Sequence, residues 1–181
     1  MSRTPDFPDK KYDVIYADPA WKYPARAFSR REALETYYDT MPIPDIHALP
    51  VQSISKDDAW LYLWVVDSLL PECLETAKRW GFTYKKSFIW NKVNMGLGTY
   101  NRGQHEQLIM AKRGKPEMPK LEGLPPSVLS VKRGTHSVKP IHFRRMIEQY
   151  HPNTDKIELF ARPLPLLSSQ DDGWDYWGNE V

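Results

Sequence analysis

This 181-residue sequence has one cysteine, no long apolar run and no recognisable signal peptide. Its single cysteine, Cys73, excludes an intramolecular disulfide. No cysteine–histidine set has the spacing of a zinc site, so we expect no metal. The longest apolar run, residues 59–66, is far shorter than the roughly 20 residues of a membrane helix. The first residues lack the apolar core of a signal peptide. We therefore expect a cytoplasmic protein with no membrane attachment.

The sequence also lacks a strong charge of either sign. It has 25 Lys and Arg against 23 Asp and Glu, a formal net charge of +2. This balance excludes a histone-like cationic surface, so any contact with nucleic acid requires a local basic patch. The glycine-rich fingerprint of NAD-binding enzymes is absent, as is the phosphate-binding loop of nucleotide hydrolases. Both of those enzyme classes are disfavoured.

Aromatic residues are abundant. They make up 13% of the chain, with 7 Trp and 10 Tyr, while hydrophobic residues make up 41% and charged residues 27%. The hydrophobic share is enough to predict a folded domain. The aromatic excess has two interpretations, a heavily aromatic core or stacking surfaces for flat ligands such as nucleobases. Composition alone leaves both open.

Hydrophobic periodicity predicts strands that alternate with helices, after a polar extension of residues 1–11. Expected strands lie at residues 12–17, 59–66, 82–90, 105–111, 128–132 and 156–161. A short helix is expected at residues 42–49. A second helix should begin at Ser68 as its N-cap and end at Gly81, and a third should begin at Lys139-Pro140. A Trp-rich tail follows. This alternation predicts one α/β domain over residues 12–181 with a mostly parallel sheet. Sites in such sheets lie beyond the carboxyl ends of the strands, which predicts Asp18, Trp90-Asn91 and Arg162 as neighbours.

The most informative tetrapeptide is Asp18-Pro19-Ala20-Trp21, which directly follows the first buried strand. One interpretation is an ordinary turn that ends a strand. The functional interpretation is a pocket for an amine on a flat ring, in which Asp18 and the Pro19 carbonyl accept the amine hydrogens and Trp21 stacks on the ring. Such fixed acceptors would stabilise the positive charge that develops on a nitrogen nucleophile.

Residues 17–21 resemble the Asp-Pro-Pro-Trp signature of N(6)-adenine methyltransferases, most closely the MT-A-seventy-like family. Four further motifs of that family match in the same order, at residues 101–114 (Asn-x-Gly-x-x-Glu and a following Lys-Arg-Gly), 136–140 (Ser-x-Lys-Pro), 157–162 (Glu-Leu-Phe-Ala-Arg) and 173–180 (Gly-Trp to Gly-Asn-Glu). The resemblance covers about residues 12–181. The chain departs from the signature at Ala20, where the family usually has a second proline; we expect a slightly looser turn.

The resemblance implies a Rossmann-like class I methyltransferase fold with a permuted motif order, the catalytic signature first and the cofactor strand last. It implies S-adenosylmethionine as cofactor. The catalytic residues would be Asp18, Pro19 and Trp21, and the cofactor-binding residues Asp18, His136, Ser137, Lys139, Phe160, Arg162, Asn179 and Glu180. Lys139 would bind the methionine carboxylate of the cofactor as a point charge. The alternative, purely structural interpretations are that Lys139 is a solvated lysine at the start of a helix and that Phe160 belongs to the core. We expect Trp177 to be a packing residue.

Basic and aromatic residues interleave on the loops expected at the same edge, as in a grip on a nucleic-acid backbone. The candidate substrate-binding residues are Lys22, Tyr23, Arg26, Arg30, Arg31, Asn91, Lys92, Arg102 and Glu106. A solvated basic loop is the alternative interpretation. Because an adenine inside a duplex is unreachable, the enzyme would flip the base or act on single strands.

The leading hypothesis is a phage or bacterial methyltransferase that acts on the exocyclic amine of adenine in DNA. An RNA N(6)-adenosine methyltransferase is the second hypothesis, because the same pocket would serve both. The third is a catalytically silent nucleic-acid-binding partner of an active methyltransferase, which the presence of Asp18 and Lys139 disfavours. A monomer, a homodimer and a complex with a partner protein all stay open.

Overall fold

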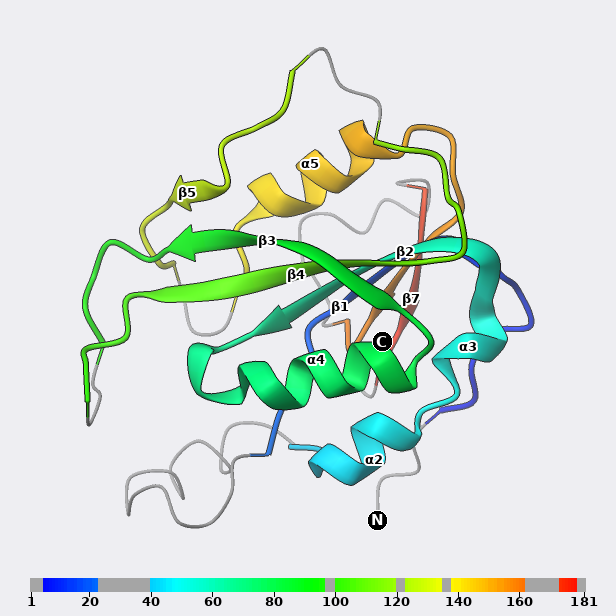
Figure 1. Cartoon of the computed structure of the whole chain (residues 1–181), viewed down its shortest axis with the longest axis horizontal. Helices are drawn as coiled ribbons and strands as arrows, with labels where there is room; N and C mark the ends of the chain where they lie inside the picture. The colour runs from blue at the N-terminus through cyan, green and yellow to red at the C-terminus, as the bar shows by residue number, and fades with distance from the viewer. Residues whose placement is uncertain are drawn as a thin grey trace.

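Short apolar strands of this chain assemble into one seven-stranded sheet in the order β5-β3-β4-β2-β1-β6-β7 (Figure 1). The computed structural model describes residues 5–22, 40–96, 100–119, 123–134, 138–161 and 173–178. The strands are β1 (Tyr12–Ala17), β2 (Ser55–Val65), β3 (Thr83–Asn91), β4 (His105–Arg113), β5 (Val128–Ser130), β6 (Lys156–Leu159) and β7 (Trp174–Trp177). All six expected strands are present, with shifted ends except at β1.

The sheet is mostly parallel, as expected for the α/β class. β1 pairs in parallel with β2 on one side and β6 on the other, and the β3–β5 and β6–β7 pairs are also parallel. Only β4 runs against its neighbours β2 and β3 among the described strands. The reversal brings the start of β4 to the edge where the other strands end.

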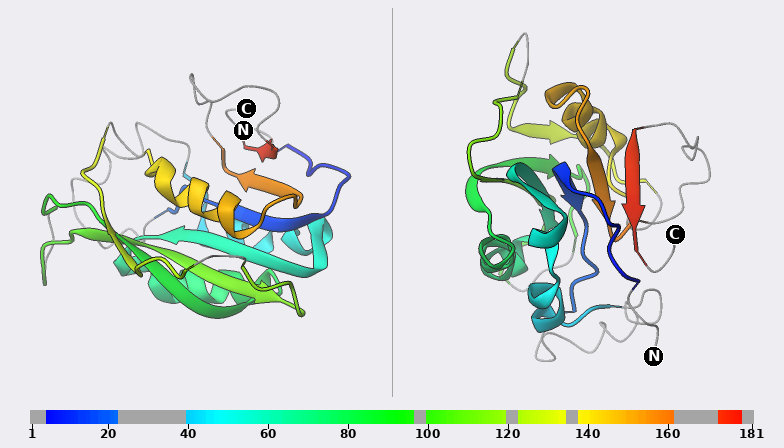
Figure 2. Two further views of the ribbon diagram at one scale, coloured as in Figure 1. Left: turned by 90° about the horizontal axis from the view of Figure 1, so that it is seen from above. Right: turned by 90° about the vertical axis from the view of Figure 1, so that its right-hand side faces the viewer.

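Helices cover both faces of the sheet (Figure 2). On one face lie α2 (Ile43–Ala48), α3 (Val51–Ile54) and α4 (Leu70–Arg79), which bury apolar residues such as Ile46 and Cys73 against β1 and β2. On the other face lies α5 (Ile141–Tyr150), which packs Phe143 and Ile147 among buried tryptophans. Among the described residues, no helix has the length and apolar character to cross a membrane.

The expected Ser68 cap of α4 is wrong. Ser68 lies in a 3-10 turn, Asp67–Leu69, and Leu69 occupies the N-cap position without a side-chain cap bond. The preceding turn and Pro71, whose ring fixes φ in the first helical turn, start the helix instead. Gly81 ends the helix as expected, because its φ of 86° is a left-handed conformation that glycine adopts without steric cost.

The tryptophan-rich tail contains a strand, β7, that the sequence patterns did not predict. Trp174 and Trp177 at its two ends are buried, which confirms the packing role expected for Trp177. The Trp177 ring lies 4.6 Å from that of Phe7, and its indole N–H donates to the Pro5 carbonyl at 3.0 Å. Part of the predicted N-terminal extension therefore packs against the edge of the sheet.

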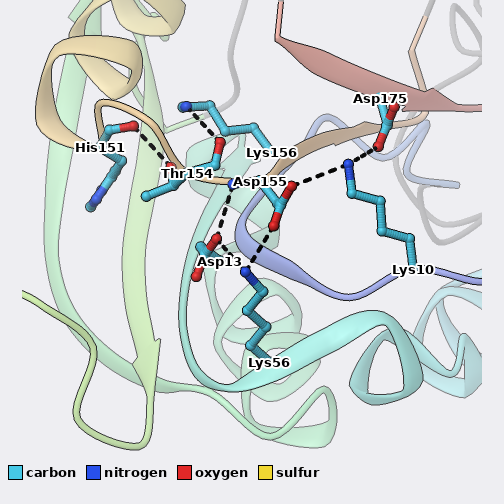
Figure 3. Close-up of polar contacts among 8 residues, drawn as sticks. All are labelled: Lys10, Asp13, Lys56, His151, Thr154, Asp155, Lys156 and Asp175. Atoms are coloured by element: carbon cyan, nitrogen blue, oxygen red, sulfur yellow. Dashed lines mark hydrogen bonds and ion pairs between the residues drawn. The ribbon is translucent and has the colours of Figure 1, made fainter.

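A network of ion pairs joins the amino ends of the parallel strands (Figure 3). Lys56 bridges Asp13 and Asp155 at 2.7 and 2.8 Å, and Lys10 bridges Asp155 and Asp175 at 3.2 and 2.9 Å. The hydrogen bond from Lys56 lowers the pKa of Asp155 below its usual value. These side chains are partly exposed, so the ion pairs add little to the free energy of unfolding. They help to fix how the strands align with one another.

A buried histidine lies near this edge, directly after α5. His151 is only 5% exposed, and its Nε2 shares a 2.8 Å hydrogen bond with the Tyr62 hydroxyl. Burial, together with the nearby charge of Lys156 and against an opposing effect of Asp13, lowers the pKa of His151 to about 4. The fold therefore holds this imidazole neutral.

Candidate active site

Asp18 stands at the carboxyl end of the central strand β1, where the backbone leaves the sheet. Its backbone N–H donates to the Leu159 carbonyl of β6 at 3.4 Å, and its side chain is 25% exposed. The next residues form a tight turn closed by the Trp21 N–H on the Pro19 carbonyl at 2.8 Å. Pro19 thereby stiffens the turn, and the Asp18 carboxylate projects at the sheet edge.

The Trp21 side chain is buried beneath this turn. It is 8% exposed and belongs to the apolar core, and its indole N–H donates to the Trp64 carbonyl at 3.1 Å. The adjoining backbone is also held, by paired bonds with Met41. In this conformation Trp21 fixes the turn that carries Asp18. The expected stacking of Trp21 on a substrate ring stays a prediction.

Lys139, which lies just before α5, brings its ammonium group onto Asp18. Its Nζ is 2.8 Å from Asp18 Oδ2 and 3.3 Å from Glu106 Oε2 of β4, and its side chain is 17% exposed. Burial on its own would lower the pKa of Lys139. The two carboxylates outweigh burial and raise this pKa above its ordinary value. The lysine is therefore a stable cation.

Glu106 continues this line of charges to a second lysine. Its Oε1 lies 3.1 Å from Lys92 Nζ at the end of β3. Asp18, Lys139, Glu106 and Lys92 thus form a row of alternating charge along the carboxyl edge of the sheet, here called the edge row. The antiparallel direction of β4 makes the row possible, because it places Glu106 at the same edge as the ends of β1 and β3.

Aromatic side chains form a rigid floor under the edge row. The Lys139 ammonium lies 5.4 Å from the Trp64 ring centroid, an arrangement that favours a cation. Trp64 is fully buried, donates to the Tyr16 hydroxyl at 2.7 Å and packs edge-on against Phe143 at 4.9 Å. The sequence analysis missed Trp64. Its place at the end of a predicted buried strand was the available signal.

A buried arginine locks α5 to the sheet behind Lys139. Arg144 is 5% exposed, and its guanidinium bonds to Glu158 at 3.1 Å and to the Tyr176 hydroxyl at 2.6 Å. It also lies 4.7 Å from the Trp174 ring and contacts Glu148. Arg144 therefore ties the helix that follows Lys139 to β6 and β7.

Phe160 follows β6 in a strained backbone conformation. Its φ is 61°, a left-handed value that costs a non-glycine residue about 1 kcal/mol or more. Its ring is partly buried and contacts Trp177 at 5.4 Å, while the next N–H, of Ala161, donates to the Trp177 carbonyl at 3.1 Å. Such strain is typical of functional sites. The cofactor role of Phe160 stays a prediction.

The expected neighbours Asp18 and Asn91 are linked through the edge row, because Asp18 lies at one end of the row and Lys92, at the other end, directly follows Asn91. Asn91 itself holds the backbone, donating to the Ser130 hydroxyl at 3.0 Å and accepting from the Val93 N–H at 3.0 Å. Arg102 donates to the Gly96 carbonyl at 3.2 Å. The β3–β4 pairing, in which Asn91 lies opposite His105, brings Asn91, Lys92 and Glu106 to one edge of the sheet.

Several predicted site residues lie outside the described residues. They are Tyr23, Arg26, Arg30 and Arg31 on the substrate side, and His136, Ser137, Arg162, Asn179 and Glu180 on the cofactor side. The structure thus gathers Asp18, Lys139, Glu106 and Lys92 from four distant segments, and it places Phe160 one residue beyond the strand that pairs with β1.

Comparison with known proteins finds a matching family and several similar proteins. The family model described as MT-A70 matches residues 12–180. The type II methyltransferase M.MunI of a Mycoplasma species is 32% identical over 98% of the chain and 81% of its own length. The N(6)-adenosine-methyltransferase catalytic subunit METTL3 of Homo sapiens is 27% identical over 94% of the chain, and the MT-A70-like adenosine methyltransferase of Drosophila melanogaster is 29% identical over the same share. The chain spans only 28% and 27% of these two proteins.

Proposed function

Because the chain belongs to the MT-A70 family of N(6)-adenine methyltransferases, we propose that it uses S-adenosylmethionine to methylate the exocyclic amine of adenine in DNA. The observation that carries the proposal is the Asp18–Lys139 pair at the carboxyl end of β1. It combines a fixed hydrogen-bond acceptor with a partly buried cation at the edge where sites of parallel sheets lie.

Asp18 and Pro19 suit the task of orienting an aromatic amine. Lys139 takes one oxygen of the Asp18 carboxylate, and the carboxylate has a second oxygen to accept an amine hydrogen. The Pro19 carbonyl receives the Trp21 N–H and retains another lone pair. Two acceptors held by a stiff turn would stabilise the positive charge that develops on nitrogen. No strong base is required, because the amine proton becomes acidic once the nitrogen is methylated.

The residues of the edge fit the cofactor. Lys139 is a partly buried cation with a raised pKa, which suits it to the carboxylate of the methionine group. Asp18 is the neighbouring acceptor for the ammonium of the same group, and Phe160 borders the site after β6. When bound, S-adenosylmethionine supplies the electrophilic methyl group. The cofactor roles of His136, Ser137, Arg162, Asn179 and Glu180 are part of this proposal.

DNA is the proposed substrate because M.MunI, a type II methyltransferase, is matched over most of its own length. RNA is the second candidate, since the relatives named adenosine methyltransferases also match nearly the whole chain. The intact Asp18–Lys139 pair weighs against a silent partner. A cytoplasmic location remains part of the proposal.

The experiment is mass spectrometry of nucleosides after incubation of the protein with S-adenosylmethionine and matched DNA or RNA oligomers. We expect N(6)-methyladenine in DNA. Asp18→Asn keeps the side-chain shape but removes the charge, and should lower kcat by about 100-fold or more, the usual effect of losing a group that stabilises transition-state charge. Asp57→Asn, at a side chain that is 95% exposed, is the matched control. Full activity of Asp18→Asn would exclude the proposed mechanism, and methylation of RNA alone would replace DNA as the substrate.

A further inference from the structure

A pocket at the Lys92 end of the edge row opens between the β3–β4 connection and the segment after β5. Its volume is about 280 Å³, and its lining residues are Lys92, Asn94, Met95, Gly96, Gly103, Arg133 and Gly134. That volume lies just below the range of roughly 300 to 1,000 Å³ for small-molecule sites. Lys92 belongs to both the pocket and the edge row, so the pocket adjoins the proposed reaction site.

The pocket wall is held in a strained shape. Val93 has a φ of 68°, an outlier for a β-branched residue, yet its side chain is 48% exposed and gains little from burial. Three hydrogen bonds fix this backbone, from the Val93 N–H to Asn91, from the Gln104 amide to the Val93 carbonyl, and from the Gly96 N–H to the Gly103 carbonyl. Strain that serves no packing purpose is typical of a binding site.

Positive charge dominates the two segments that form the pocket. Residues 91–106 and 123–134 contain four lysines and arginines, Lys92, Arg102, Lys132 and Arg133, against one acid, Glu106. The chain as a whole is nearly balanced, with 25 basic and 23 acidic residues. The charge of this region therefore favours an anionic ligand.

Glycine leaves room for a ligand against the backbone. A Cβ atom on Gly96 would lie 2.8 Å from the Gly103 carbonyl, so a side chain there would push the two walls apart. A Cβ atom on Gly103 or Gly134 would meet no described atom within 4 Å and would occupy open space. Bare backbone next to cations is a common arrangement for binding phosphate.

Two exposed side chains of the β3–β4 connection, one of them in the pocket wall, point to a nucleotide chain. Met95 is 57% exposed, and Tyr100 is fully exposed. An unburied aromatic ring among basic residues is the combination with which proteins hold unstacked nucleotides, the ring against a base and the cations on the backbone. A small inorganic anion would make no use of Tyr100.

We propose that this pocket binds a backbone phosphate of the nucleic-acid strand close to the target nucleotide, with Lys92 and Arg133 as its cations and Tyr100 against a neighbouring base. The identity of the ligand rests on the proposed function. The pocket adds a contact beyond the residues that hold the reacting amine, and it orients the strand toward Asp18 through the shared Lys92.

The test measures how salt weakens binding of a fluorescent single-stranded oligodeoxynucleotide, by anisotropy. Each phosphate contact contributes about 0.7 to the slope of log K against log salt for single strands. Arg133→Gln should lower the magnitude of that slope by about this amount. Lys78→Gln, the same charge change on exposed α4, is the control and should leave the slope unchanged. Circular dichroism checks that both variants are folded.

Tyr100→Ala provides the second measurement. Loss of base stacking should weaken binding at least fivefold, the low end of the usual effect, with no change in the salt slope because no charge is removed. Equal slopes for Arg133→Gln and the control would overturn the proposal, as would unchanged affinity for Tyr100→Ala. These readouts are independent of catalysis. A lower salt slope for Arg133→Gln without any methylated nucleoside would support the pocket and refute the proposed function. Methylation together with an unaltered slope would support the proposed function and refute the pocket.

Discussion

The buried His151 makes the stability of this protein depend on pH below neutrality. Its pKa is about 4 in the folded chain, against the ordinary histidine value of 6.5 that we take for the unfolded chain, because burial disfavours the imidazolium. Between these two pKa values, His151 is protonated in the unfolded chain and neutral in the folded chain. The contribution of His151 to stability is complete above pH 6.5 and is lost as the pH falls from 6.5 to 4.

The size of the loss follows from these two pKa values. At pH 5 the unfolded state gains about 2 kcal/mol from protonation of His151 relative to the folded state, and below pH 4 the full loss is about 3 kcal/mol. That is a large part of the 5–15 kcal/mol by which native proteins are ordinarily stable.

Urea unfolding at pH 7.5 and pH 5, for the unsubstituted protein and for His151→Gln, measures this effect. Glutamine is neutral at both pH values and has polar atoms for the Tyr62 hydroxyl. We expect the free energy of unfolding of the variant to change between the two pH values by about 2 kcal/mol less than that of the unsubstituted protein. His142→Gln, at an exposed position of α5, is the control. An equal pH dependence for His151→Gln and the unsubstituted protein would refute the reasoning.

Two further substitutions test how the fold is held. Arg144→Met should lower the free energy of unfolding by about 3 kcal/mol, because it leaves the half-buried Glu158 without its cation, and adding Glu158→Gln should recover part of the loss in urea unfolding. Gly114→Ala should cost about 1–3 kcal/mol, since φ at Gly114 is 61° and a methyl group would overlap the Asp57 carbonyl. A thermal midpoint for Gly114→Ala equal to that of the unsubstituted protein would contradict this second expectation.

Local patterns predicted buried strands such as β1 well, because burial on both faces produces a nearly continuous apolar run that is visible in the sequence. β1 matches its expected bounds, and the ends of the other strands shift by up to four residues. β7 was missed for a physical reason. Its Trp174 and Trp177 gain their burial from β6, Phe7 and α5, which are distant in the chain, so no local pattern marks the segment as a strand.

The sequence pointed to individual residues of the candidate site but not to the ion pairs between them. The position of Asp18 after a buried strand and the resemblance of the Lys139 segment to a known motif identified both residues. Their ion pair depends on the packing of α5, and the edge row depends on the reversed direction of β4. For the same reason the sequence did not show that Glu106 bonds to two lysines; its predicted role in substrate binding stays a prediction.

The position of β1 in the sheet has a consequence for synthesis of the chain. β1 is made early, yet one of its two neighbours, β6, is Lys156–Leu159, far later in the sequence. At the usual ~5–20 residues per second, the ribosome needs about 7 to 28 s to make the segment between them. Throughout that interval one edge of an apolar strand is open to other chains. We therefore expect the nascent protein to be most prone to aggregation, and most dependent on chaperones, before residue 156 emerges.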